Sequence, residues 1–213
     1  MTLDILATGS SGNCYILTDS DGQVLILDVG IKFERIMNGI DFKLNNIEGI
    51  CVTHEHKDHS LSADRFKRMG ILIADKPGIY SFGNFKVRTF DLVHDVPCIG
   101  FYISHKEIGS MVYLTDTEYC KYRFPNINHI LVECNYDKDL LSGEHPAKEH
   151  ILTGHMELQT VKDFIKANKT NELKTVILCH MSRENLDCQK AHESIKEIFN
   201  NTYLAYIGER ITL

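Results

Sequence analysis

The sequence THEHKDHS, residues 53–60, directly follows an apolar, β-branched run at residues 47–52. If residues 49–53 form a strand and the chain stays extended just beyond it, His54 and His56 project to the same side, because side chains alternate with period two. These two histidines can share one metal ion. Asp58 and His59 follow after the chain has begun to turn toward the next helix, so we expect them to serve a second ion a few ångströms away.

Strand-like and helical patterns are mixed along the whole chain. Two sheets packed face to face with helices outside them would accommodate this pattern, which predicts an α/β fold with four layers. We expect a single domain, 1–213, with two similar halves, roughly 1–105 and 106–213. The expected strands are 3–8, 14–18, 24–28, 49–53, 71–74, 85–90, 99–104, 111–115, 129–133, 175–180 and 203–206, and the expected helices are 60–69, 157–168 and 187–199.

The composition limits the class of protein. With 213 residues, 43% of them hydrophobic, the chain can bury a sizeable core. Its seven cysteines are odd in number and lack Cys-x-x-Cys spacing, which indicates reduced thiols in a cytoplasmic protein. The amino terminus lacks an export signal, and no apolar run reaches the ~20 residues that a membrane crossing needs. The net charge of −6 argues against binding nucleic acid through a broad basic face, although two bound cations would still make a nuclease site locally positive.

Three more potential ligands, His94, Asp116 and His180, each follow a probable strand end. A lone histidine in such a place is more often structural, but the repeated placement favours a metal site. Imidazole and carboxylate ligands without thiolates suit Zn²⁺, and they also accept Mn²⁺ or Fe²⁺. Two divalent ions carry four positive charges, of which Asp58, Asp116 and a bridging hydroxide would cancel three. The remaining positive charge favours an anionic substrate such as a phosphodiester.

In this order and spacing, the ligand pattern resembles the signature of the metallo-β-lactamase superfamily, an αββα sandwich with a dinuclear site at its edge. The resemblance implies that one ion is held by His54, His56 and His94. It implies that the other ion is held by Asp58, His59 and His180. Asp116 would bridge the two ions, and Asp28 would support the ligand loop without touching a metal.

Five further segments narrow the resemblance: SSGNC at 10–14, YLTDT at 113–117, ECNYD at 133–137, GHM at 154–156 and HMSREN at 180–185. They resemble the bacterial YycJ/WalJ group, which is associated with 5′-to-3′ DNA exonuclease activity and is related to ribonuclease Z. The resemblance implies a DNA substrate and a proton donor at His155 for the leaving group. Glu133 could orient His155, or it could cap or pair within the fold. Ser182 and Arg183 could bind a substrate phosphate, although Arg183 could equally be a solvated surface charge.

The leading hypothesis is a dinuclear metal-dependent phosphodiesterase or nuclease that uses a metal-bridging hydroxide, with Asp58, Glu133 and His155 in the catalytic set. A small-molecule thioesterase, lactonase or β-lactamase-like hydrolase on the same site is the first alternative. A non-catalytic metal-binding or partner-binding module is the second. The other histidines are expected to be structural or superficial: His105, His129, His145, His150 and His192.

Overall fold

The computed structural model of the protein describes residues 1–141 and 148–213. The first sheet contains β1 (Thr2–Ala7), β2 (Cys14–Thr18), β3 (Val24–Leu27), β4 (Ile47–Cys51), β5 (Ile73–Ala74) and β13 (Arg210–Thr212). The second contains β6 (Ile79–Phe82), β7 (Phe85–Leu92), β8 (Cys98–His105), β9 (Gly109–Leu114), β10 (His129–Glu133), β11 (Thr175–Cys179) and β12 (Thr202–Leu204). The helices are α1 (Phe33–Gly39), α2 (Lys57–Ser60), α3 (Ala63–Arg68), α4 (Lys148–Gly154), α5 (Leu158–Asn168) and α6 (Cys188–Lys196).

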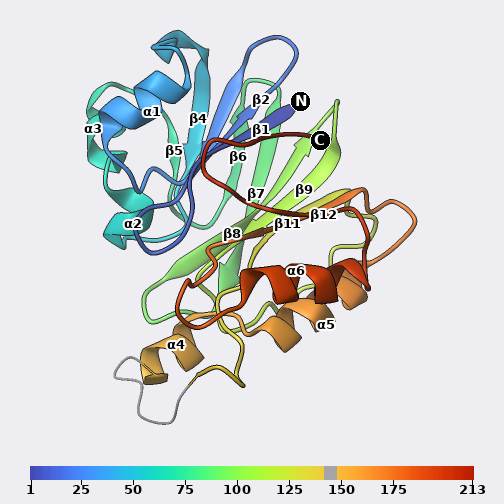
Figure 1. Cartoon of the computed structure of the whole chain (residues 1–213). Coiled ribbons are helices and arrows are strands. Elements are labelled where there is room, and N and C mark those ends of the chain that lie inside the picture. Colours follow the sequence, from blue (N-terminus) through green and yellow to red (C-terminus); the bar gives the residue numbers. More distant parts are fainter. Residues whose placement is uncertain (142–147) are drawn as a thin grey trace.

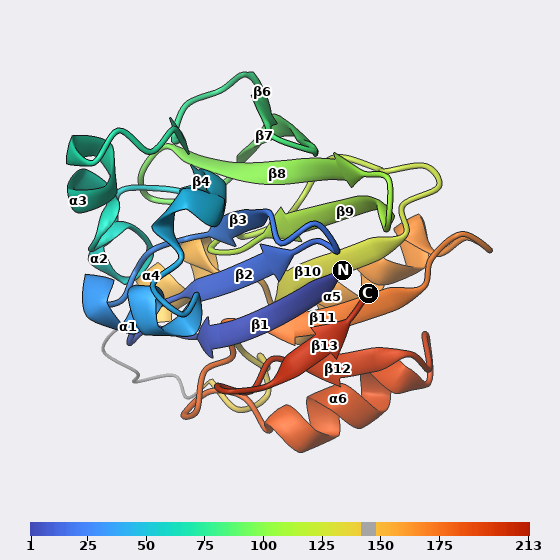
Figure 2. The same ribbon diagram turned by 90° about the horizontal axis from the view of Figure 1, so that it is seen from above.

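The two sheets face each other, with α1, α2 and α3 outside the first and α4, α5 and α6 outside the second (Figure 1). This confirms the expected four-layer αββα sandwich. The first sheet has the strand order β13-β1-β2-β3-β4-β5, and the second has the order β12-β11-β10-β9-β8-β7-β6. Figure 2 shows the sandwich from above, with both chain ends beside β13 and β1.

Three apolar clusters hold the layers together. The cluster between the sheets includes the fully buried Tyr15, Phe101 and Leu131. A second cluster joins the second sheet to α5 and α6, and a third joins the first sheet to α1 and α3. Strands buried on both faces explain why several expected strands read as continuous apolar runs without alternation.

The expected helices at 157–168 and 187–199 are present as α5 and α6. Each begins after an acidic residue whose side chain accepts backbone N–H groups of the first turn: Glu157 for α5 and Asp187 for α6. Such caps satisfy donors that have no partner within the helix. Further along α5, Val161 and Ile165 lie on the buried face, as the helical spacing predicts.

The expected helix at 60–69 is wrong in its bounds, because the structure divides this segment into α2 and α3. Between the two helices, the Ser62 hydroxyl donates to the Ile31 carbonyl at 2.6 Å, and its N–H donates to the Val29 carbonyl at 3.0 Å. These long-range bonds fix the junction to the loop after β3. Residue spacing within the segment alone does not reveal them.

The chain passes from the first sheet to the second between β5 and β6, well before the expected division near residue 105. The reason is that β6, β7, β8 and β9 continue as antiparallel neighbours, so residues 79–105 pair with the second half of the chain. β13 then returns to the edge of the first sheet beside β1. Neither β6 nor β13 was expected from the sequence.

Parallel strand pairs determine where loops gather. β3 pairs in parallel with β4, and β9, β10 and β11 are parallel neighbours. Because the carboxyl ends of parallel strands meet at the same edge of a sheet, residues that follow these five strands are brought close together. In the described residues, no helix is long and apolar enough to span a membrane. All seven cysteines lie in the described part of the chain as free thiols, and five are buried.

Replacing Phe101 with alanine tests the packing between the sheets. Phe101 is fully buried, so Phe101→Ala should lower the free energy of unfolding by about 3–5 kcal/mol. Phe42 is 67% exposed, so the control Phe42→Ala should change this free energy by less than about 0.5 kcal/mol. Equilibrium denaturation in urea measures both. Equal effects of the two variants would contradict this description of the core.

Candidate metal centre

Three polar residues at the carboxyl ends of strands have a left-handed backbone conformation. Asp28 follows β3 with φ 57°, Asp116 follows β9 with φ 50°, and His180 follows β11 with φ 45°. This conformation is unfavourable for residues other than glycine and concentrates at functional sites, where the surrounding structure holds it in place. Here it turns all three side chains toward the edge where the two sheets meet.

The first group of potential ligands consists of His54, His56 and His94. Their imidazoles converge between the end of β4 and the loop after β7. His56 Nδ1 lies 3.1 Å from His54 Nε2 and 3.4 Å from His94 Nε2. Nitrogens bound at 2.0–2.1 Å to one tetrahedral zinc ion are about 3.3 Å apart, so these separations suit a shared ion. Burial lowers the pKa of His54 to about 2, with help from neighbouring imidazoles. His54 is therefore neutral, which is the form that binds a metal.

A backbone carbonyl orients His94. Its Nδ1 lies 2.9 Å from the carbonyl oxygen of Gly154, at the end of α4, so Nδ1 carries the proton and donates it there. The lone pair of Nε2 is then directed to the other two imidazoles. A β-carbon on Gly154 would lie 3.2 Å from the His94 ring, so a glycine allows this close approach.

A second group of potential ligands combines two carboxylates with two buried imidazoles. His59 Nε2 lies 3.4 Å from Asp58 Oδ2 and 3.3 Å from Asp116 Oδ2. His180 Nε2 lies 3.9 Å from Asp58 Oδ2. The same Asp116 oxygen is 3.8 Å from His54 Nε2, so this carboxylate faces both groups of ligands.

His180 provides an internal test of whether this second group fits a cation. Its Nε2 is buried and has no hydrogen-bond partner among the described residues, although a buried polar atom is almost always paired. The other ring nitrogen, Nδ1, lies 2.5 Å from Asp116 Oδ1. A divalent cation beside Nε2 would satisfy the unpaired nitrogen, and the two carboxylates would balance its charge. The donor set thus fits Zn²⁺, Mn²⁺ or Fe²⁺.

The buried Asp28 carboxylate orients His59. Asp28 Oδ2 accepts a hydrogen bond from His59 Nδ1 at 2.7 Å and one from the Tyr113 hydroxyl at 2.6 Å. Asp28 Oδ1 accepts the backbone N–H of Thr53 at 2.8 Å. With Nδ1 engaged in this way, His59 presents Nε2 to the second group, an arrangement that is common behind metal-binding histidines. Asp28 lies where the sequence expected a supporting aspartate.

Asn13 and Gly30 fix the backbone of Asp58, a role that the sequence prediction missed. The Asn13 N–H donates to the Asp58 carbonyl at 2.7 Å, and the Gly30 N–H donates to the Asn13 carbonyl at 2.9 Å. A β-carbon built on Gly30 would lie 1.7 Å from the Asp58 carbonyl oxygen, so no side chain fits there. The available signals were the glycine after the Leu-Asp-Val run and the SSGNC segment at 10–14, which contains Asn13.

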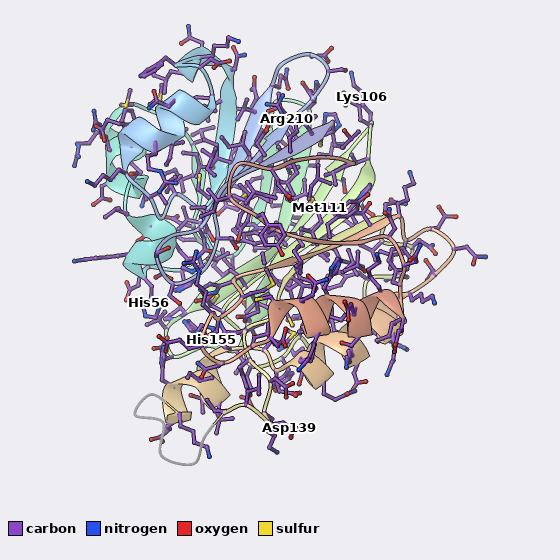
Figure 3. The ribbon with its side chains drawn as sticks, viewed as in Figure 1. His56, Lys106, Met111, Asp139, His155 and Arg210 are labelled. Atoms are coloured by element: carbon purple, nitrogen blue, oxygen red, sulfur yellow. The ribbon has the colours of Figure 1, made fainter. Side chains whose placement is uncertain are left out.

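His155 forms a buried pair with Glu133 beside the second group. Its Nδ1 lies 3.1 Å from Glu133 Oε2, and its ring centre is 5.3 Å from that of His180. Thr117 fixes Glu133 by donating its N–H to Oε1 at 2.6 Å. Burial disfavours the charged imidazole, but the hydrogen bond and the negative charge of Glu133 outweigh this and raise the pKa of His155 to about 9. Figure 3 shows His155 and His56 at the same end of the sandwich, far from Lys106.

Ser182 and Arg183 follow His180 at the rim. Ser182 Oγ accepts the N–H groups of Asn185 and Glu184 at 3.1 and 3.3 Å, which makes it part of a turn, and its own proton has no acceptor among the described residues. Arg183 is exposed and makes no ion pair with another described residue. Both therefore lie near the second group of ligands, with the guanidinium in solvent.

Asp95 and His150, which were not predicted as site residues, also lie at the site. Asp95 Oδ1 is 3.0 Å from His94 Nε2 and 3.6 Å from His56 Nε2. His150 Nδ1 is 3.6 Å from Asp95 Oδ2, and His150 is exposed, as expected of a surface histidine. The first group of imidazoles thus has an acidic neighbour at its solvent side.

The remaining histidines lie elsewhere or outside the described residues. His105 belongs to a group with Asp19 and Glu107 that has the composition of a metal site. Its atoms are already paired, however: His105 Nε2 lies 3.2 Å from Asp19 Oδ2, and Glu107 pairs with the terminal amine. His192 Nε2 donates to a backbone carbonyl, while both ring nitrogens of the buried His129 lack hydrogen-bond partners in the described part of the chain. His145 lies outside the described residues.

Comparisons with known proteins agree with this geometry. The profile of the metallo-beta-lactamase superfamily matches residues 7–71, which include the ligand loop. The exodeoxyribonuclease WalJ of Streptococcus pneumoniae is 28% identical over 227 aligned positions, which cover 88% of this chain and 84% of that protein. The structure of YhfI from Bacillus subtilis, a metallo-beta-lactamase fold protein, superposes with a TM-score of 0.76 at 14% identity and covers 99% and 98% of the two chains. The short form of human tRNase Z superposes with a TM-score of 0.66 at 17% identity and covers 100% and 99%.

The layered fold and the strand-end ligands, together with these matches, define a metallo-β-lactamase-fold protein. Within that class, the chain resembles the WalJ exodeoxyribonuclease over most of its length. Both resemblances expected from the sequence are confirmed, including the structural relation to ribonuclease Z.

Gly30→Ala tests the backbone contact that fixes Asp58. The added methyl group has to displace the ligand loop, so we expect the variant to bind less than half the metal of the unmodified protein, measured by elemental analysis after dialysis. Gly78→Ala is the matched control, because a β-carbon there meets only the end of the Tyr80 side chain, at 3.2 Å. Unchanged metal content in Gly30→Ala would show that the close contact does not constrain the site.

Proposed function

We propose that the chain is a metal-dependent phosphodiesterase that removes nucleotides from DNA, in the 5′-to-3′ direction expected from the sequence. The observation that carries the proposal is the buried His155–Glu133 pair beside the ligand groups. The pair raises the pKa of His155 to about 9, so His155 stays protonated at neutral pH. The printed name of the relative WalJ, an exodeoxyribonuclease, supports the choice of DNA.

The residues at the site divide between two cations. His54, His56 and His94 would hold one ion, and Asp58, His59 and His180 would hold the other, with Asp116 between them. Zn²⁺ suits these ligands best, and Mn²⁺ or Fe²⁺ are the alternatives. When bound, two divalent ions supply a nucleophile from water near neutral pH and neutralise charge on phosphate oxygens.

His155 would act on the leaving group. Its Nδ1 is engaged by Glu133, so the proton on Nε2 is the one available for transfer. The alkoxide released from a phosphodiester is strongly basic and needs such a proton, whereas a thiolate released from a thioester does not. This difference favours phosphodiesters over thioesters, one of the substrate classes in the first alternative of a thioesterase, lactonase or β-lactamase-like hydrolase.

Three neighbouring residues would complete the site. Asp28 holds His59 in the orientation that presents Nε2, so it keeps the second ligand group assembled. Ser182 and Arg183 lie at the rim after β11, where a free hydroxyl proton and an exposed guanidinium could bind a phosphate next to the one being cleaved. The seven free cysteines fit a reducing compartment such as the cytoplasm.

Asp116→Asn tests the proposed chemistry. The metal-loaded protein should degrade end-labelled DNA and hydrolyse bis(p-nitrophenyl) phosphate, with little activity on RNA, a thioester or a β-lactam. Asn retains the size of Asp116 but loses the charge that faces both ligand groups, so turnover should fall at least about 100-fold while thermal unfolding shows a folded protein. A metal-loaded protein that cleaves the thioester and leaves both phosphodiesters intact would favour the alternative hydrolase.

His155→Gln tests the proton donor by comparing two leaving groups. Turnover of DNA should fall by 10²- to 10⁴-fold, and turnover of bis(p-nitrophenyl) phosphate much less, because nitrophenolate leaves without protonation. For the unmodified protein, DNA turnover should fall as the pH rises through about 9, since the acid form of His155 is present only below its pKa. His155→Gln should lack this alkaline decrease. Equal losses on both substrates would instead assign His155 a structural role.

A further inference from the structure

A long groove lies on the outer face of the second sheet, separate from the ligand groups. Its volume is about 920 Å³. One wall is formed by β7 and β8, and the other by residues 122–125, which follow the loop after β9. In Figure 2, β6 and β7 lie at the opposite edge of the sheet from β12 and α6. We refer to this feature as the β7 groove.

The β7 groove is positively charged in a chain with a net charge of −6. Its lining includes Lys86, Arg88 and Arg123 and a single carboxylate, Asp91. All three cationic residues are exposed, and none forms an ion pair with another described residue, whereas cations elsewhere, such as Arg65 and Lys67, do. Unpaired cations gathered along one groove match a polyanion in charge.

Aromatic rings lie along the same groove. Phe90 contacts Tyr122 and Phe124, with ring centres 5.6 and 5.0 Å apart, and Tyr102 stacks on Phe124 at 6.1 Å. Phe90, Tyr102 and Tyr122 are only partly buried, so part of each ring faces the groove. Cationic and aromatic side chains in one groove are the combination that holds single-stranded nucleic acid, because unpaired bases can stack on the rings.

Both walls of the β7 groove lead to the metal centre. β7 ends at Leu92, two residues before His94, and the other wall begins six residues after Asp116. Two hydrogen bonds join the walls at that end: Val93 N–H to Thr117 Oγ1, and Glu118 N–H to the Val93 carbonyl, both at 3.0 Å. A strand that follows the groove would therefore approach the ligand groups.

From these observations we infer that the β7 groove binds a single strand of DNA and guides it to the metal centre. The inference rests on the proposed nuclease function and adds the place where the substrate is held. On the outer face of β7, Lys86 and Arg88 are two residues apart, so they can contact successive phosphates about 7 Å apart. From Lys86 to Asp91 the strand spans about 17 Å. At about 7 Å per nucleotide, this is room for roughly two or three nucleotides.

A charge-reversal variant provides the test. The groove variant carries Lys86→Glu, Arg88→Glu and Arg123→Glu, and the matched control carries Arg68→Glu, Lys174→Glu and Lys196→Glu at exposed positions outside the groove. Fluorescence anisotropy measures binding of the metal-loaded proteins to a phosphorothioate-linked deoxythymidine 12-mer, which resists cleavage, between about 0.05 and 0.3 M salt. Hydrolysis of bis(p-nitrophenyl) phosphate is measured in parallel, because this small ester does not reach the groove.

We expect the groove variant to bind the 12-mer at least about tenfold more weakly at 0.15 M salt. Its plot of log affinity against log salt should be shallower by about 2, since each phosphate contact on a single strand contributes about 0.7. Its hydrolysis of the small ester should stay within about twofold of the unmodified protein, and the control variant should match the unmodified protein in both measurements.

Unchanged affinity of the groove variant, or an equal loss in the control variant, would overturn the inference. Failure of the proposed function would give a different result: neither the unmodified protein nor any variant would hydrolyse the small ester or DNA. Loss of 12-mer binding in the groove variant alone would then still support the groove as a site for single-stranded DNA. Equal displacement of the 12-mer by poly-L-glutamate would show that the groove recognises charge alone, and would also overturn the inference.

Discussion

The Asp28 carboxylate is the point at which the two sheets and the ligand loop are joined. It is fully buried, and it accepts hydrogen bonds from Thr53 after β4, from Tyr113 on β9 and from His59 on α2. A carboxylate without these partners would be costly to bury. The fold can therefore place Asp28 there only when all three elements are in position. The same contacts orient His59, so folding and assembly of the site depend on one side chain.

The site also depends on backbone conformations that are unfavourable in isolation. Asp28, Asp116 and His180 are held with positive φ at the ends of strands in both sheets. Each strand is buried and paired on both sides, which leaves its last residue little freedom to relax. The ligand groups are thus preorganised by the core, and the loop backbone around Asp58 is held by Gly30 and Asn13. Such rigid support is what a metal centre needs, since its ligand atoms must stay a few ångströms apart.

Many features of the fold could be predicted because they depend on local patterns. Continuous apolar runs marked most of the strands, and apolar residues at helical spacing marked α5 and α6. The short strands β6 and β13 were missed because each is stabilised by its partners across the sheet and carries little pattern of its own. The junction between α2 and α3 was missed for the same reason, since Ser62 is held by the distant Ile31 carbonyl. The β7 groove was also absent from the prediction, because its two walls are 30 or more residues apart in places.

By itself, the sequence determined the chemical nature of the site. Seven imidazole and carboxylate groups in a recognisable order at strand ends predict a site for divalent cations, because metal preference follows ligand type. Only the tertiary structure decided which atoms face one another. It places one Asp116 oxygen between two ligand groups and buries His155 against Glu133. It also leaves Nε2 of His180 without a hydrogen-bond partner among the residues that the structure describes. These distances depend on the packing of two sheets whose strands lie far apart in the chain, and residue spacing carries no information about them.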